Sequence, residues 1–207
     1  RSEIERQVGP VLDRLRDAQF LPPAELSVQG VDWTLTGRIE GLTDRARLQY
    51  RCAAIKPKDL ARAWTAHLLL NAAAEEGAAL PRVTRLIGTD GERRFGPVAR
   101  PRKLLDALLA GYRRALAEPL PLFEEAGYAF AARLHDPKRS DDPVATAWKE
   151  AYAAWFGDDF RNTPGDRDDP FVALCFRGGD PFRDRRGDFE SLARAFWAPL
   201  MDHVEEG

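Results

Sequence analysis

Residues 31–52 read VDWTLTGRIEGLTDRARLQYRC and hold two apolar–polar alternations separated by a turn. The first alternation begins at Val31 and continues through Gly37–Glu40, and the turn covers Gly41–Arg45. The second, over residues 47–52, places basic and amide side chains on one face and Leu48, Tyr50 and Cys52 on the other. A period of two is typical of half-buried strands. The segment therefore predicts two strands joined by a short turn.

The segments on either side complete an α/β arrangement. Apolar residues fall at helical spacing over residues 3–17, and Leu26 and Val28 alternate with polar residues in a further strand. A helix is predicted over residues 58–75 because its apolar side chains form one stripe. A β-hairpin follows over residues 83–98, with a Thr-Asp-Gly turn. The first hundred residues thus read helix, three strands, helix, two strands.

The second half of the chain is predicted to be helical. One amphipathic helix covers residues 104–116. Three later helices are predicted to begin at capping acids, namely Asp142, Asp169 and Asp188. We expect an α/β core over residues 1–100 and a helical extension over residues 101–207, packed on the core as one structural domain.

Composition narrows the class of protein. Of the 207 residues, 44% are hydrophobic and 31% charged, which is typical of a soluble globular chain. No apolar run approaches the roughly 18 residues of a membrane span, so we expect a cytoplasmic protein without membrane contact. The chain begins at Arg1 rather than Met, and we expect a fragment of a larger protein. Cys52 and Cys175 lie in apolar patterns and are expected to be buried.

Charge is distributed unevenly along the chain. Residues 37–114 carry 16 basic and 8 acidic residues, a balance of +8, whereas residues 115–207 carry 11 and 19, a balance of -8. The basic block predicts a phosphate-facing surface, and the acidic block predicts a second surface with a different partner.

The order helix, three strands, helix, strand resembles the common core of the PD-(D/E)xK nuclease superfamily. Members similar to RecB read approximately Gly-x-Ile-Asp on one strand and Val-Asp-Tyr-Lys on the next, followed by a helix with Gln-x-x-x-Tyr. Here Gly37–Glu40 reads Gly-Arg-Ile-Glu and Leu48–Arg51 reads Leu-Gln-Tyr-Arg. The helix carries His67-Leu-Leu-Leu-Asn71 at the place of the Gln/Tyr pair. The resemblance implies an αβββαβ core.

The same comparison implies a degenerate catalytic site at Glu40, Gln49 and Arg51. Nucleases of this family hold Mg²⁺ through carboxylates. Gln49 is neutral, and Arg51 does not deprotonate, so it cannot replace the family's lysine. Glu40 can instead pair with Arg38 or Arg51 across the strands. We expect no catalytic residues, no metal and no cofactor, although whether the larger assembly is an enzyme is a separate question.

The chain is similar to the C-terminal domain family of the exodeoxyribonuclease V gamma subunit, RecC. Residues 104–114, running into Glu118–Phe123, and residues 169–178 add to that resemblance. It implies a non-catalytic scaffold in double-strand-break repair, which helps to separate and guide DNA strands. It also implies contacts with the beta and alpha subunits, which are RecB-like and RecD-like.

The resemblance and the basic block together predict non-specific binding of duplex or forked DNA. The primary candidates are Arg38, Arg47, Arg51, Arg93 and Arg94, and further basic residues are Arg82, Arg85, Arg100, Arg102 and Lys103. Alternatively, these arginines only solvate the surface or pair with the acidic half of the chain.

Two other functions stay open. The first is an active PD-(D/E)xK nuclease with different acids, for which Asp32 and Asp44 are the candidates; neither begins an Asp-x-Lys pair. The second is an interaction module that does not contact DNA.

Overall fold

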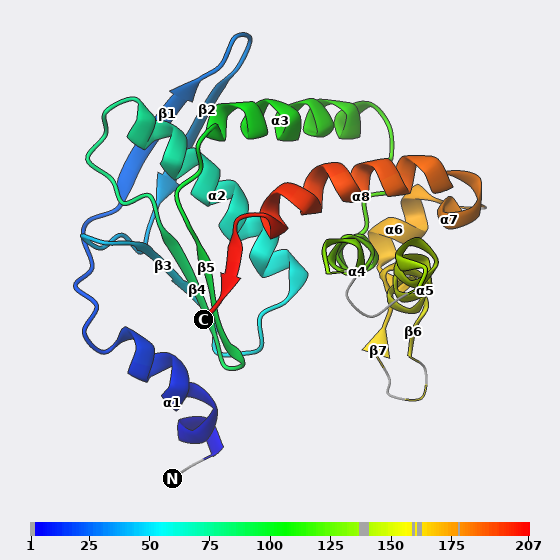
Figure 1. Ribbon diagram of the computed structural model, residues 1–207, viewed down its shortest axis with the longest axis horizontal. Coiled ribbons are helices and arrows are strands. Elements are labelled where there is room, and N and C mark those ends of the chain that lie inside the picture. The colour runs from blue at the N-terminus through cyan, green and yellow to red at the C-terminus, as the bar shows by residue number, and fades with distance from the viewer. Residues whose placement is uncertain (1–2, 137–140, 159, 161–162, 178) are drawn as a thin grey trace. The chain divides into compact units, whose positions relative to one another are not determined.

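The computed structural model describes residues 3–136, 141–158, 160, 163–177 and 179–207 (Figure 1). The chain forms two compact units. The first contains residues 1–106 and 203–207, and the second contains residues 107–202. The boundary between the units therefore falls after Asp106, and the last five residues of the chain return to the first unit. The expected division after residue 100 stays a prediction.

The first unit begins with helix α1 (Glu3–Leu15) and an antiparallel hairpin of β1 (Ala24–Gln29) and β2 (Thr34–Ile39). Strand β3 (Arg47–Tyr50) belongs to a different sheet from this hairpin. The two are linked by a bridge between Leu42 and Arg47 and by a hydrogen bond from the Leu48 amide to the Gly41 carbonyl at 2.7 Å. The predicted strands and turn are thus present, but β2 and β3 are not paired along their length.

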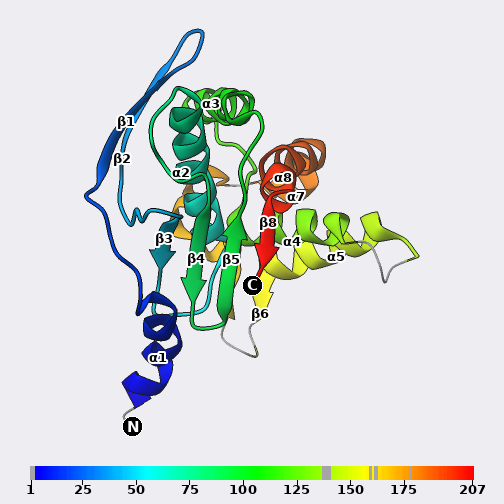
Figure 2. The same ribbon diagram turned by 60° about the vertical axis from the view of Figure 1, so that its left-hand side comes forward.

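The central sheet has the order β3-β4-β5-β8 (Figure 2). Helix α2 (Pro57–Glu75) connects β3 to β4 (Thr84–Gly88), and this connection makes the two strands parallel. Strand β5 (Gly91–Phe95) forms the predicted hairpin with β4. Strand β8 (Val204–Glu206), which the sequence analysis missed, pairs antiparallel with β5.

Helix α3 (Pro101–Ala117) runs from the first unit into the second. The second unit continues with α4 (Glu124–His135), α5 (Pro143–Phe156), the short strands β6 (Gly157–Asp158) and β7 (Thr163–Pro164), the 3₁₀ helix η1 (Asp166–Asp168), α6 (Pro170–Cys175), α7 (Pro181–Asp184) and α8 (Arg186–Met201). Its core is aromatic, and Phe182 lies 4.6 Å from Phe189 and 4.9 Å from Trp155 between ring centroids. This unit is held mainly by packing of large rings.

Acidic residues begin several of these helices, as the sequence predicts. Asp142 caps α5 by accepting from the Ala145 amide at 3.0 Å, and Asp169 caps α6. Asp166 accepts from the first-turn amide of Ala126 at 2.7 Å and so caps α4 from 40 residues away. The prediction for Asp188 is wrong, because α8 already starts at Arg186 and Asp188 lies within its first turn.

The predicted fold class is confirmed at the level of a mixed α/β chain. Among the described residues, no helix has the length and apolarity to cross a bilayer.

The burial expected for both cysteines is wrong: Cys52 and Cys175 are exposed. Cys52 lies beyond the end of β3 rather than in the strand, and Cys175 lies in the predicted helix but is its last residue and exposed.

Candidate functional site

The three degenerate-site residues each contact a different neighbour. Glu40 is exposed after the end of β2, and its carboxylate accepts from Arg38 Nε at 3.2 Å. Gln49 on β3 accepts through Oε1 from Arg47 Nη2 at 3.0 Å. Arg51 forms an ion pair with Asp59. Of the two partners expected for Glu40, the structure shows Arg38.

Asp59 is a site residue that the sequence analysis missed. It lies in the first turn of α2, where its carboxylate also accepts from the Lys56 amide at 2.9 Å. The side chains of Arg51 and Asp59 are 28% and 12% exposed, so the pair is largely shielded from water. A negative charge at a helix N-terminus is favourable. The signal was an acid three residues after the N-cap Lys56, the position of the acid in a capping box.

These contacts do not form a carboxylate set. Among the described residues, no group of three or more His, Cys, Asp or Glu side chains is arranged to hold a metal ion. Asp44, a candidate of the active-nuclease alternative, is exposed and pairs with Arg45 at 3.5 Å. Asp32 lies exposed in the connection between β1 and β2. Proteins hold Mg²⁺ through one or two carboxylates together with waters. Gln49 is neutral and Arg51 is a cation, so these two residues do not fit the ion.

Strand register places the five primary DNA-binding candidates on different surfaces. Side chains alternate between the faces of a strand, so Arg93 and Arg94 point to opposite faces of the sheet. Arg93 lies on the face of Arg47 and Gln49, since the register aligns Gln49, Leu86 and Arg93 across three strands. This face is covered by α2, whose His67 contacts Thr84.

Arg94 therefore lies on the opposite face, beside Arg85. The remaining candidates, Arg38 and Arg51, lie on β2 and just beyond β3. The five arginines do not form one continuous basic face.

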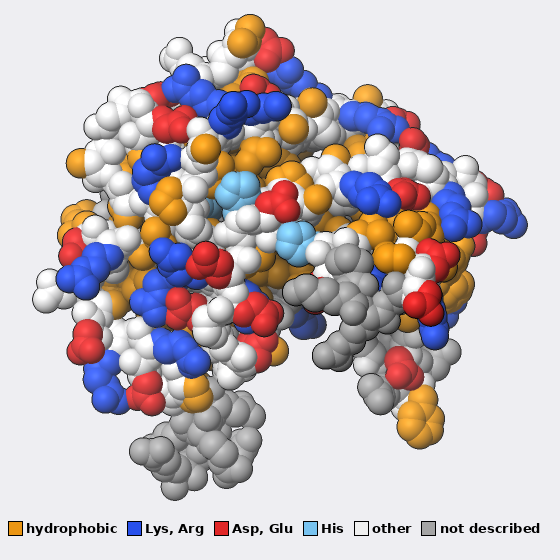
Figure 3. All heavy atoms as spheres, viewed as in Figure 1, with side chains coloured by type: hydrophobic (Ala, Val, Ile, Leu, Met, Phe, Trp, Pro, Cys, Tyr) orange, Lys and Arg blue, Asp and Glu red, His pale blue; other side chains and the backbone are white. Residues whose placement is uncertain are grey.

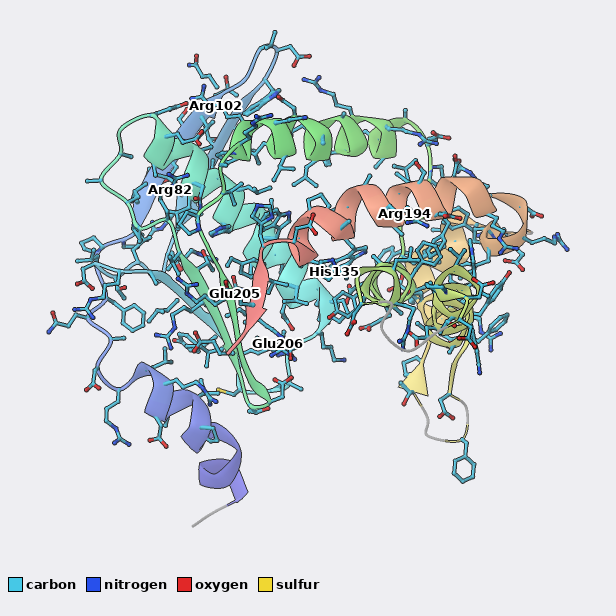
Figure 4. All side chains as sticks on the ribbon, viewed as in Figure 1. Arg82, Arg102, His135, Arg194, Glu205 and Glu206 are labelled. Atoms are coloured by element: carbon cyan, nitrogen blue, oxygen red, sulfur yellow. The ribbon has the colours of Figure 1, made fainter. Side chains whose placement is uncertain are left out.

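Acids of the C-terminal strand neutralise both hairpin arginines. Arg93 pairs with Glu206 at 3.2 Å, and Arg94 pairs with Glu205 at 2.8 Å. Figure 4 labels both glutamates on β8. On the side of the first unit seen in Figure 3, basic and acidic side chains are interleaved. Arg93 and Arg94 thus pair with the acidic half of the chain, and whether they also contact DNA stays a prediction.

Arg47 is a partly buried candidate. Its Nε and Nη1 atoms are buried and have no hydrogen-bond partner among the described residues. Burial lowers the pKa of its guanidinium from the ordinary value. The side chain therefore lies inside the first unit, and Arg47 is a poor candidate for a surface phosphate contact.

His67 and Asn71 occupy the place of the family's Gln/Tyr pair, and both are completely buried. His67 Nε2 lies 2.9 Å from the Gly96 carbonyl, which can only accept, so Nε2 carries the proton. Nδ1 then accepts from the Thr84 hydroxyl at 2.9 Å. Asn71 accepts from the Val98 amide at 3.1 Å and donates to the His67 carbonyl at 3.0 Å. The pair joins α2 to the sheet and to the segment after β5, so both residues have a packing role.

The first unit is a mixed α/β fold in which Glu40, Gln49 and Arg51 each bind another side chain of the unit. The family model of the RecC C-terminal domain matches residues 1–135, about two thirds of the chain. The chain belongs to this family, as the sequence predicted. A search of curated proteins found no match. RecC is the gamma subunit of exodeoxyribonuclease V, the RecBCD complex of DNA repair, and the family makes this chain part of such a subunit.

Proposed function

We propose that this domain is a nuclease-shaped, non-catalytic part of the gamma subunit that guides DNA strands and contacts the other subunits. The observation that carries the proposal is the ion pair of Arg51 with Asp59. In this pair the side chain at the family's lysine position binds Asp59 and has a structural role. The parallel pairing of β3 with β4 around α2 supports a PD-(D/E)xK core.

The chemistry of the remaining groups supports a loss of cleavage. A nuclease of this class needs a metal ion to activate water and to stabilise the charge that develops on the phosphate. Gln49 brings no negative charge, and Arg51 stays protonated at physiological pH. The only acid of the three, Glu40, is exposed and paired with Arg38. These residues therefore support binding of DNA through the charge and shape of its backbone, without cleavage.

Purified full-length gamma subunit, without the beta subunit, is expected to show no metal-dependent cleavage of DNA. The measurement is nicking of plasmid and linear DNA with Mg²⁺ or Mn²⁺, with the isolated beta subunit as a positive control. Nicking that disappears in Glu40→Ala would show that the site is active and would refute the non-catalytic assignment.

We also propose that the acidic half of the chain, residues 115–207, contacts the alpha, RecD-like subunit. The net charge of this half is -8, which disfavours binding of the negatively charged phosphates of DNA. Two large apolar side chains of α6, Phe171 and Leu174, are 77% and 58% exposed. Neighbouring exposed apolar side chains are typical of a surface that binds another protein.

Replacing both apolar residues, Phe171→Ser with Leu174→Ser, is expected to weaken capture of the alpha subunit by full-length gamma subunit. The measurement is a quantitative pull-down from purified subunits. Val31→Ser is the control, because Val31 is equally apolar, fully exposed and located in the first unit. Equal capture by all three proteins would exclude α6 from the contact.

A further inference from the structure

A polar groove of about 700 Å³ lies in the first unit, on the sheet face opposite α2. Its walls come from the end of α1 and the residues after it, from the turn before β3, and from β3, β4 and β5. The charged side chains that line it are Arg14, Asp17, Asp44, Arg45, Arg85 and Arg94. Four are arginines and two are carboxylates, so the lining favours an anion. Two of these arginines, Arg14 and Arg45, were not among the basic residues singled out from the sequence.

Two of the arginines are placed against each other by the strand register. Arg85 on β4 lies directly opposite Arg94 on β5. Like charges at directly opposed positions destabilise a sheet, so this pair requires compensation. Glu92 supplies part of it by accepting two hydrogen bonds from Arg85, both at 2.6 Å. Glu205 accepts one from Arg94 at 2.8 Å.

This compensation leaves room for another anion. A guanidinium has five N–H donors, and the bonds to the two glutamates use two on Arg85 and one on Arg94. The side chain of Glu205 is 68% exposed, and exposed ion pairs contribute little to stability. A phosphate can therefore share or replace Glu205 at low cost. Arg45, 91% exposed, has only the neighbouring Asp44 at 3.5 Å as an ion-pair partner among the described residues.

We propose that this groove binds the phosphodiester backbone of a DNA strand. The inference rests on the proposed DNA-guiding function and assigns a surface to it. Arginine suits phosphate because its planar N–H groups match two phosphate oxygens at once. The contact fixes the position of the strand without reading bases. The DNA path then lies on the face of Arg85 and Arg94, and the face of Arg47 and Arg93 is covered by α2.

The test uses the full-length gamma subunit assembled with its beta and alpha subunits. Binding to a fluorescent forked DNA is measured by anisotropy over a series of salt concentrations. Arg45→Ala with Arg94→Ala is expected to weaken binding equally for all sequences and to reduce the slope of log affinity against log salt by about 2. The control is Lys58→Ala with Arg62→Ala, which removes two exposed cations of α2 outside the groove and should change neither quantity.

Two further variants test the proposal in the opposite direction, because they remove an acid instead of an arginine. Glu205→Gln and Asp44→Asn each remove a negative charge at the groove and are expected to tighten binding of the fork. If the arginine pair and both acid variants leave affinity and slope unchanged, the groove is not the DNA path.

The remaining outcomes separate this inference from the function on which it rests. If Arg38→Ala with Arg100→Ala reduces the slope while the groove variants do not, the domain guides DNA through another surface. If no variant of the first unit changes binding, the DNA-guiding function itself fails. If the groove variants weaken subunit assembly but leave fork affinity unchanged, the groove is a protein contact and the proposal is wrong.

Discussion

Asn71→Ala is expected to lower the free energy of unfolding by about 4 kcal/mol, more than any surface substitution in this chain. The amide oxygen accepts from the Val98 backbone at 3.1 Å and from Arg82 Nε at 3.2 Å. The amide nitrogen donates to the His67 carbonyl at 3.0 Å. Val98 is 1% exposed, so water cannot replace the lost acceptor. A buried donor without a partner costs about 1–3 kcal/mol, and this substitution leaves several groups unsatisfied.

Urea unfolding of the chain, followed by tryptophan fluorescence, measures this loss. Trp64 is a suitable reporter because its ring lies 5.8 Å from that of His67. Thr65→Ala is the matched control on the exposed side of the same helix, and it should change stability by less than about 0.5 kcal/mol. A value for Asn71→Ala as small as that of the control would show that the amide does not hold α2 to the sheet.

Local patterns in the sequence predicted the elements that are built from local contacts. Alternating residues predicted strands β1 and β2 but not their pairing, and the apolar stripe placed α2 within one residue of its observed start. The caps at Asp142 and Asp169 were identified because a capping acid lies next to the helix that it starts. Helix α4 was missed because its N-cap position is Phe123, which offers no capping group, and the cap comes instead from the distant Asp166.

Long-range pairing is what the sequence could not predict. Strand β8 has three residues and no alternation, and its partner β5 lies more than 100 residues earlier. This single pairing decides the chemistry of the candidate site, because it brings Glu205 and Glu206 to Arg94 and Arg93. The degenerate positions Glu40, Gln49 and Arg51 followed from the resemblance. The partner of Arg51 did not, since Asp59 lies on the following helix.

Acidification is expected to destabilise the chain through His67. Burial lowers the pKa of this imidazole to about 4 from its ordinary 6.5, and the positive charges of His203, Arg47 and Arg82 add to the shift, while the Gly96 carbonyl opposes it. The folded pKa is the lower one, so the unfolded chain binds the proton more readily. The neutral ring therefore stabilises the fold fully above pH 6.5, and this contribution falls as the pH drops toward 4.

The expected loss from His67 is about 2 kcal/mol at pH 5 and about 3 kcal/mol at pH 4, relative to pH 7.5. Urea unfolding at each pH measures the total change, which also includes other titrating groups. Comparison with His67→Gln isolates the imidazole, because glutamine cannot titrate and the variant should lose most of the dependence between pH 7.5 and pH 5. Thr65→Ala is the control, since this exposed side chain of the same helix does not titrate and its loss should leave the pH dependence unchanged. A pH profile of His67→Gln parallel to that of the unmodified chain would mean that His67 does not resist protonation in the folded state.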